Sequence, residues 1–181
     1  MNIAHSFAIA LIACVTLLIG SVGSGGEGTS LRITSDAFED GKPIPQEFTC
    51  DGADRSPPLH WDGAPEKSKA LALVVDDPDA PSGNWNHWLI YNMPPATQAL
   101  GAGVAANATL GDGSRQGTND FGRIGYGGPC PPRGSSHRYV FKVYALSAPL
   151  ELEPGAKRDA VMKAVKEKTL AEAQVVGRYG R

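Results

Sequence analysis

Three stretches in the middle and later parts of the chain have the hydrophobic pattern of β-strands. The run 69–75 (KALALVV) is almost entirely apolar, which is typical of a strand buried on both faces. The segments 87–93 (HWLIYNM) and 137–146 (HRYVFKVYAL) are rich in aromatic and β-branched residues, which favour strands. Between the last two, the glycine-rich region 101–134 predicts long loops with short edge strands.

The hydrophobic period changes near the C-terminus. In the segment 156–176 apolar residues recur at helical spacing, with lysines and a glutamate between them. This pattern predicts an amphipathic helix over 156–176 that Gly177 ends. The apolar positions that share a face are Ala160, Val161, Ala164 and Val165. Several strands followed by a late helix favour a mainly β fold, a sandwich or a barrel with helical packing.

The N-terminal region has a different character. Residues 7–19 (FAIALIACVTLLI) are apolar apart from one Thr, and the first charged side chain is Glu27. The run is shorter than the roughly 20 apolar residues of a transmembrane helix. It therefore predicts a signal peptide at 1–26, followed by a single domain at 27–181. We expect an exported protein, periplasmic or secreted, without stable membrane insertion after signal cleavage.

Two alternatives to a cleaved signal peptide stay open. The region before the apolar run lacks Lys and Arg, so the segment could instead be an uncleaved membrane anchor. The residues 11–14 (LIAC) also fit a lipoprotein signal, although the apolar run continues beyond Cys14.

Composition narrows the classes of partner. The chain has 181 residues, of which 41% are hydrophobic, so it can bury the core of one ordinary domain. Its formal net charge of -2 argues against nucleic acid and anionic membrane surfaces, which require a basic excess. The 22 Gly and 14 Pro follow no short period, so they indicate turns rather than a collagen-like chain.

Removal of the signal peptide would leave two cysteines, Cys50 and Cys130. An oxidising compartment outside the cytoplasm would permit a disulfide between them. The alternative is a pair of small, unpaired, buried residues, because separation in sequence says nothing about distance in the fold.

Polar clusters lie at the ends of the predicted strands. Asp77 and Asp79 follow the first strand in a turn that prolines make rigid, so the turn can hold two carboxylates in a fixed geometry. Trp85 and His87 open the next strand. Strict alternation would place His87 on one face with Leu89, opposite Trp88. A solvated acidic turn and a hydrogen-bonded core histidine are the simpler interpretations of these two clusters.

A third cluster precedes the last predicted strand. The glycine- and proline-rich loop 125–134 leads to His137 and Tyr139, which alternation places on a shared face. Backbone N–H groups in such a loop can bind an anion. The sequence contains no phosphate-binding loop, no H-E-x-x-H and no G-x-S-x-G motif. Two aspartates and two histidines also suit a metal, but their spacing neither supports nor excludes one.

In order and spacing, these clusters resemble the phosphatidylethanolamine-binding protein family, also called Raf kinase inhibitor-like proteins, and in particular its bacterial exported branch. The resemblance runs from about Leu31 to the C-terminus. The segments that carry it are TCDG at 49–52, SPPL at 56–59, DPDAP at 77–81, Trp85 with His87, GPCPP-x-G at 128–134 and HRY at 137–139.

The resemblance implies a two-sheet β-sandwich with a C-terminal helix and a small surface pocket for phosphate-like anions, including phospholipid head groups. In such a pocket the two histidines would donate hydrogen bonds to the anion, helped by a tyrosine and loop N–H groups. The aspartates would orient the imidazoles or receive an ammonium group, and Trp85 and the prolines would form an apolar wall. The implied lining residues are Asp77, Asp79, Trp85, His87, Gly128, Pro131, Pro132, His137 and Tyr139.

Three functions follow as hypotheses. The first is an exported, non-enzymatic protein that needs no cofactor and binds a small anionic ligand such as phosphate or phosphoethanolamine. The second is an inhibitor or interaction protein with a protein partner, a kinase or a peptidase. The third is a metal-assisted hydrolase in which the aspartates and histidines of the clusters activate water.

Overall fold

The structure is a computed structural model that describes residue 1 and residues 30–181. The expectations for the signal peptide at 1–26, and for Cys14 within it, lie outside the described residues. No helix in the described part of the chain combines the length and the apolar character that crossing a membrane requires.

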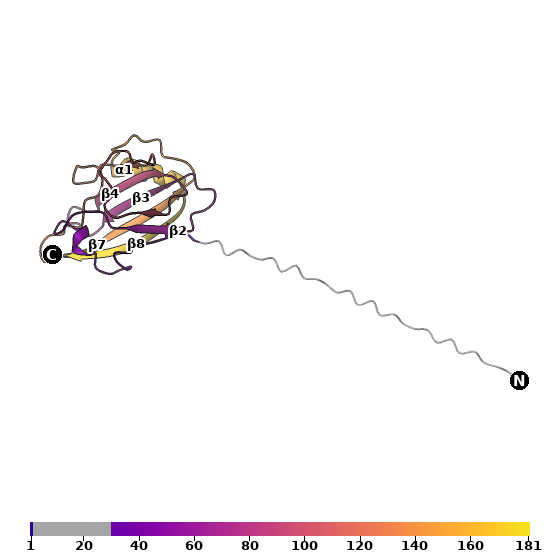
Figure 1. Ribbon diagram of the computed structural model, residues 1–181, viewed down its shortest axis with the longest axis horizontal. Coiled ribbons are helices and arrows are strands. Elements are labelled where there is room, and N and C mark those ends of the chain that lie inside the picture. Colours follow the sequence, from indigo (N-terminus) through magenta and orange to yellow (C-terminus); the bar gives the residue numbers. More distant parts are fainter. Residues whose placement is uncertain (2–29) are drawn as a thin grey trace.

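Two antiparallel sheets form the body of the molecule (Figure 1). One sheet has the strand order β1-β2-β5 and the other β6-β4-β3-β7-β8. The strands are β1 (Arg32–Thr34), β2 (Leu59–Asp62), β3 (Ala70–Asp77), β4 (Trp85–Met93), β5 (Ala99–Leu100), β6 (Arg115–Gln116), β7 (Ser136–Leu146) and β8 (Thr169–Gly180). A short 3-10 helix, η1, spans Gln46–Phe48, and the α-helix α1 spans Arg158–Lys168. The expected fold class, a mainly β two-sheet sandwich with a late helix, is confirmed.

Strand β3 lies at the centre of both hydrophobic cores, which explains its unbroken apolar sequence. Leu71, Leu73 and Val75 face the core between the two sheets. The alternate positions, including Ala70 and Ala72, face a second core that α1 closes with Val161 and Val165. The strand is therefore buried on both faces, as its sequence predicts.

The predicted helix over 156–176 is too long. The helix ends at Lys168, and Thr169–Gly180 is instead the edge strand β8, which pairs with β7 from Leu146 to Ser136. The long hydrogen-bonding edge of β7 explains the change, because the segment can pair the backbone groups of its inner edge there. On its outer edge, Val176 and Arg178 bond to residues 40–44. Its side chains follow period 2: Ala171, Ala173 and Val175 pack on the sandwich core, and Glu172 is exposed.

The expectation that Gly177 ends a helix is wrong. Gly177 lies within β8, where the absence of a side chain makes room for side chains of another segment. A Cβ atom at this position would lie 2.3 Å from Cγ1 of Ile44 and 3.1 Å from the ring of Phe38. Both neighbours are buried in the sandwich core. The glycine thus lets the segment before η1 cover the end of β8.

Gly177→Ala is expected to destabilise the protein by about 1–3 kcal/mol, the usual cost of overpacking a core. Replacing a glycine that ends a helix would not overpack the core and would therefore not carry this cost. Chemical denaturation measures the difference. Gly111→Ala is the matched control because a Cβ there meets no atom within 4 Å. Its free energy of unfolding should stay within about 0.5 kcal/mol of the parent value. Equal stability of the two variants would contradict the packing of β8 described here.

Candidate functional site

A cleft opens at one end of the five-stranded sheet. Because neighbouring strands are antiparallel, the C-terminal end of β3 meets the N-terminal ends of β4 and β7 there. The cleft has a volume of about 230 Å³. Its lining residues are Asp77, Ala80, Pro81, Ser82, Trp85, His87, Phe121, Cys130, Pro131, Pro132 and His137.

Asp77 and His137 form a buried pair in the cleft. Nδ1 of His137 donates a hydrogen bond of 2.7 Å to Oδ2 of Asp77, and the backbone N–H of Asp79 donates to Oδ1 at 2.8 Å. Both side chains continue the alternation of inward-facing residues along β3 and β7, so they lie on the sandwich side of the sheet, at its end. With the Nδ1 proton held by the carboxylate, Nε2 of His137 stays free of hydrogen bonds to the described residues.

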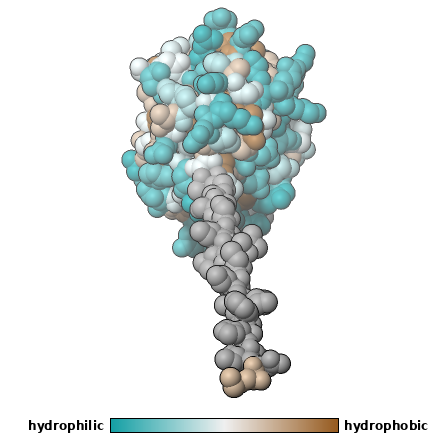
Figure 2. Space-filling model, turned by 90° about the vertical axis from the view of Figure 1, so that its right-hand side faces the viewer, coloured by the Kyte–Doolittle hydropathy of each residue, from teal (hydrophilic) through white to brown (hydrophobic). Residues whose placement is uncertain are grey.

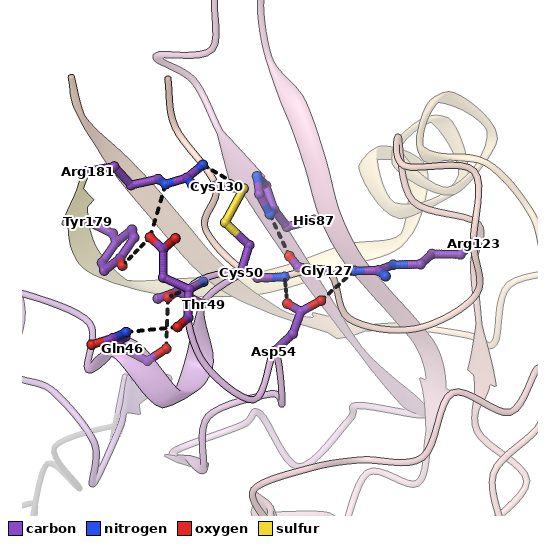
Figure 3. Close-up of a disulfide and its surroundings, with 12 residues drawn as sticks. Gln46, Thr49, Cys50, Asp54, His87, Arg123, Gly127, Cys130, Tyr179 and Arg181 are labelled. Atoms are coloured by element: carbon purple, nitrogen blue, oxygen red, sulfur yellow. Dashed lines mark hydrogen bonds and ion pairs between the residues drawn. A yellow bond between two sulfur atoms is a disulfide. The ribbon is translucent and has the colours of Figure 1, made fainter. Parts of the chain in front are cut away.

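His87 is held in the same tautomer by a different acceptor. Its Nδ1 lies 2.6 Å from the carbonyl oxygen of Gly127, and since a carbonyl only accepts, this nitrogen carries the proton (Figure 3). Burial lowers the pKa of His87 below its ordinary 6.5, against the opposing effects of Gly127 and of Asp77. At neutral pH the ring is therefore uncharged, with Nε2 as a hydrogen-bond acceptor.

A β-bulge turns His87 into the cleft. Val75 pairs with Trp88 and Asp76 pairs with Asn86, so His87 is an extra residue on β4 with no partner on β3. His87 consequently packs edge-on against Tyr139, with ring centroids 5.1 Å apart, on the side of the sheet where Trp88 also lies. The expectation from strict alternation, with His87 and Trp88 on opposite faces, is wrong for this reason.

Aromatic and proline side chains form the apolar part of the cleft. Phe121 packs edge-on against both Trp85 and His87, with centroid distances of 5.5 and 5.2 Å. Among residues 30–181 it is the one large hydrophobic side chain that is exposed, at 42% of its surface. The face of the molecule in Figure 2 is mostly hydrophilic by comparison. Phe121 is not among the expected lining residues, because its only signal in the sequence is an isolated aromatic residue in a glycine-rich loop.

Three expected lining residues lie next to the cleft without lining it. Asp79 forms an ion pair with Arg138, at 2.6 Å between Oδ1 and Nη2. The hydrogen bonds that Arg138 donates to this carboxylate lower the pKa of Asp79 to about 2. Tyr139 lies against His87, and its buried hydroxyl has no hydrogen-bond partner among the described residues. Gly128 is buried and is not among the residues that line the cleft. The other six, Asp77, Trp85, His87, Pro131, Pro132 and His137, line the cleft.

Gly127 and Gly128 use their N–H groups for hydrogen bonds within the protein that support the cleft wall. The N–H of Gly127 donates to the carbonyl of His87 at 2.9 Å, and the N–H of Gly128 donates to Oδ1 of Asp54 at 2.6 Å. A Cβ on Gly128 would lie 2.5 Å from that oxygen and 2.7 Å from the carbonyl oxygen of Phe48. Glycine is therefore required here for close approach of the segment after η1.

A disulfide joins these two segments. Cys50 and Cys130 are bonded, with their Cα atoms 5.4 Å apart, and 80 positions separate them in sequence (Figure 3). The disulfide alternative of the sequence analysis is therefore confirmed. The backbone N–H of Cys50 also donates to the carbonyl of Pro129 at 3.1 Å. The wall that carries Cys130, Pro131 and Pro132 is thus anchored covalently to the segment after η1.

The side chains suggested for a metal have other partners. Asp77 accepts from His137 and Asp79 pairs with Arg138, while Nδ1 of His87 donates to a carbonyl. Within residues 30–181, no group of three or more His, Cys, Asp or Glu side chains has an arrangement that could hold a metal ion.

Comparison with known proteins shows the family of this chain. The family model "Phosphatidylethanolamine-binding protein" matches residues 34–180. The chain belongs to the phosphatidylethanolamine-binding protein family. A relative from Methanothermobacter thermautotrophicus, named UPF0098 protein, is 50% identical over 151 residues, which cover 83% of this chain and 99% of the relative. A Mycobacterium tuberculosis protein provisionally named lipoprotein LppC is 41% identical over 150 residues, covering 82% of this chain and 72% of that protein.

Solved structures of phosphatidylethanolamine-binding protein relatives share the fold. E. coli YbcL, described as a member of the mammalian family, superposes with a TM-score of 0.79 at 32% identity. A provisionally assigned family homologue from Chlamydia trachomatis superposes with a TM-score of 0.77 at 37% identity. In both cases the match covers 84% of this chain and 99% of the other.

The buried, neutral His87 should make the stability of this family member depend on pH. The unfolded chain takes up a proton on His87 near pH 6.5, whereas the folded chain takes it up at lower pH. The free energy of unfolding should therefore fall as pH drops through 6.5, by up to about 1.4 kcal/mol per pH unit for this one proton. Urea denaturation at several pH values measures the slope.

His87→Gln should reduce that slope, because the variant loses the group that titrates differently in the two states. The matched control is His60→Gln, since His60 is exposed and pairs with the exposed Asp36 at 2.8 Å. The control should keep the slope of the parent protein. An unchanged slope in His87→Gln would contradict the neutral, buried state assigned to His87.

Replacing both cysteines by serine should lower the free energy of unfolding by about 4.5 kcal/mol, the loop-closure entropy of an 80-residue separation. The fold should survive, because Tyr126 still donates to the carbonyl of Phe48 and Gly128 to Asp54 across the same junction. Urea denaturation of the oxidised parent and the double variant measures the loss. A loss below about 1 kcal/mol would show that the disulfide does not stabilise the protein by reducing the loop-closure entropy of the unfolded chain.

Proposed function

We propose that this member of the phosphatidylethanolamine-binding protein family binds small phosphate-like anions in the cleft at the end of the five-stranded sheet. The observation that carries the proposal is the shared orientation of His87 and His137. Each donates its Nδ1 proton to a fixed oxygen of the protein, Gly127 and Asp77 respectively, so that each ring offers Nε2 to a ligand. Two such nitrogens in a cleft of about 230 Å³ suit a tetrahedral oxyanion.

Binding is coupled to protonation. A neutral imidazole can accept a hydrogen bond from a protonated phosphate oxygen, whereas an imidazolium donates a charged hydrogen bond to an anionic one. Because burial lowers the pKa of His87, the charged donor forms only when the pH falls below 6.5 or when an anion supplies the compensating charge. The net charge of -2 provides no long-range attraction, so these local donors carry the binding.

The apolar wall favours ligands in which the anion is attached to a small organic group. Trp85 and Phe121 lie at the cleft together with Pro131 and Pro132. Phosphoethanolamine, the head group for which the family is named, combines a phosphate with such a group. The relative from C. trachomatis carries the same family name provisionally, which supports a head group as ligand class.

The proposal includes binding without turnover. Both oxygens of Asp77 already accept hydrogen bonds, from His137 and from the backbone of Asp79, which argues against its use as a general base. The exported location also belongs to the proposal. The disulfide between Cys50 and Cys130 supports an oxidising compartment, and the relative named as a lipoprotein supports export.

The decisive experiment titrates the protein with sulfate, phosphate and phosphoethanolamine while the two imidazoles are followed by NMR. Sulfate keeps its charge between about pH 5.5 and 7.5, so any pH dependence of its affinity comes from the protein. Its affinity should rise as the pH falls, by up to about tenfold per pH unit for each proton taken up. Calorimetry in buffers of different ionisation enthalpy measures that proton uptake.

His87→Gln should weaken sulfate binding and reduce proton uptake, and His137→Gln should weaken sulfate binding, whereas His60→Gln should change neither. Resonances of both imidazoles that stay unshifted at millimolar anion would refute the assignment. Release of inorganic phosphate from phosphoethanolamine would refute binding without turnover.

A further inference from the structure

The disulfide is exposed at the edge of the cleft and has an unusual electrostatic environment. Cys50 and Cys130 are both exposed residues, and Cys130 also lines the cleft. Nη1 of Arg181 lies 3.3 Å from Sγ of Cys130 (Figure 3). Two backbone hydrogen bonds keep Arg181 beside the cleft loop, one from its N–H to the carbonyl of Ser135 and one from Gly134 to its own carbonyl.

The two sulfur atoms therefore differ in charge environment. The guanidinium of Arg181 stabilises negative charge on Cys130, as a neighbouring cation does for a thiolate. Cys50 is instead followed in sequence by Asp51, whose carboxylate accepts from Tyr179 and pairs with Nε of Arg181 at 3.0 Å. In thiol–disulfide exchange, the sulfur that forms the more stable thiolate is the better leaving group.

We propose that Cys50–Cys130 is a thiol–disulfide exchange site, in which a dithiol reductant attacks Cys50 and Cys130 leaves as a thiolate beside Arg181. The thiolate of the reductant forms a bond to Sγ of Cys50, the Sγ–Sγ bond breaks, and its electron pair passes to Cys130. The second thiol of the reductant then attacks the mixed disulfide and releases Cys50. Two electrons and two protons pass from the dithiol, which becomes a disulfide, to the two cysteines.

Reduction changes the cleft but leaves the fold in place. The hydrogen bonds from Gly128 to Asp54 and from Cys50 to Pro129 do not involve sulfur, so the two segments stay in contact. The adjoining residues Cys130 and Pro131 line the cleft, and they lose their covalent anchor. The reduced protein should therefore have a lower affinity for the anion than the oxidised protein, an expectation that rests on the proposed anion binding.

The site of attack is tested on the full oxidised chain with glutathione. A brief reaction is quenched with an alkylating reagent, and peptide mapping locates glutathione and the alkyl group. Glutathione is expected on Cys50, with alkylated Cys130, in about tenfold excess over the reverse product. Equal labelling, or an excess of glutathione on Cys130, overturns the proposal.

Two variants distinguish an electrostatic effect on the rate of reduction from an effect of loosened structure. Both break the ion pair between Asp51 and Arg181, but they remove charges of opposite sign. Arg181→Gln should slow reduction by dithiothreitol by about tenfold and abolish the labelling preference. Asp51→Asn should accelerate reduction, since Arg181 stays charged while the competing carboxylate is gone. Arg133→Gln, which removes an exposed arginine from the same loop, is the matched control and should react like the parent. Shifts of the two test variants in the same direction overturn the role of Arg181.

Two further readouts complete the test. In Cys50→Ser, the thiol pKa of Cys130, followed by ultraviolet thiolate absorbance, should lie below the ordinary value of about 8.5 and return to it with Arg181→Gln.

Sulfate affinity should be several-fold lower in the reduced protein than in the oxidised one. Equal affinity overturns the coupling to the cleft. Absence of sulfate binding in both forms would refute the proposed function, while the labelling pattern would still decide the exchange chemistry.

Discussion

The hydrogen bond between Asp77 and His137 is the contact on which the cleft depends. Burial of a carboxylate is costly unless donors compensate for the lost water, and Asp77 receives two, one from the imidazole and one from the backbone of Asp79. The bond connects the end of β3 with the beginning of β7, 60 positions away in sequence. It therefore fixes the geometry of the strand ends and the tautomer of His137 in one interaction.

The rest of the cleft is built around that fixed point by elements from separate parts of the chain. The bulge in β4 brings His87 towards His137, and the carbonyl of Gly127 holds its ring. The loop that supplies this carbonyl is held in turn by Asp54, through Gly128, and Asp54 also pairs with Arg123 at 2.7 Å. The imidazoles thus owe their orientation to a rigid support that extends well beyond the cleft itself.

Local hydrophobic patterns predicted β3, β4 and β7 because each strand is buried through most of its length, and the motifs of the family located Asp77, His87 and His137. Features that depend on pairing were not predictable in this way. The edge strand β8 exists because β7 offers a long free edge, and the inward turn of His87 requires knowledge of the register. Phe121 reaches the cleft through loop geometry, which leaves no periodic signal.

The long separation between the two bonded cysteines has a consequence for how the chain folds. All strands from β2 to β6 lie between Cys50 and Cys130 in sequence, so the sulfur atoms meet only after the segment after η1 has docked on the loop at the start of β7. Closing a loop of this size early is entropically unfavourable and has no local contact to reward it. Oxidation is therefore expected late in folding, after these two segments have docked, and it then adds a covalent bond to a junction that hydrogen bonds such as Gly128 to Asp54 already hold.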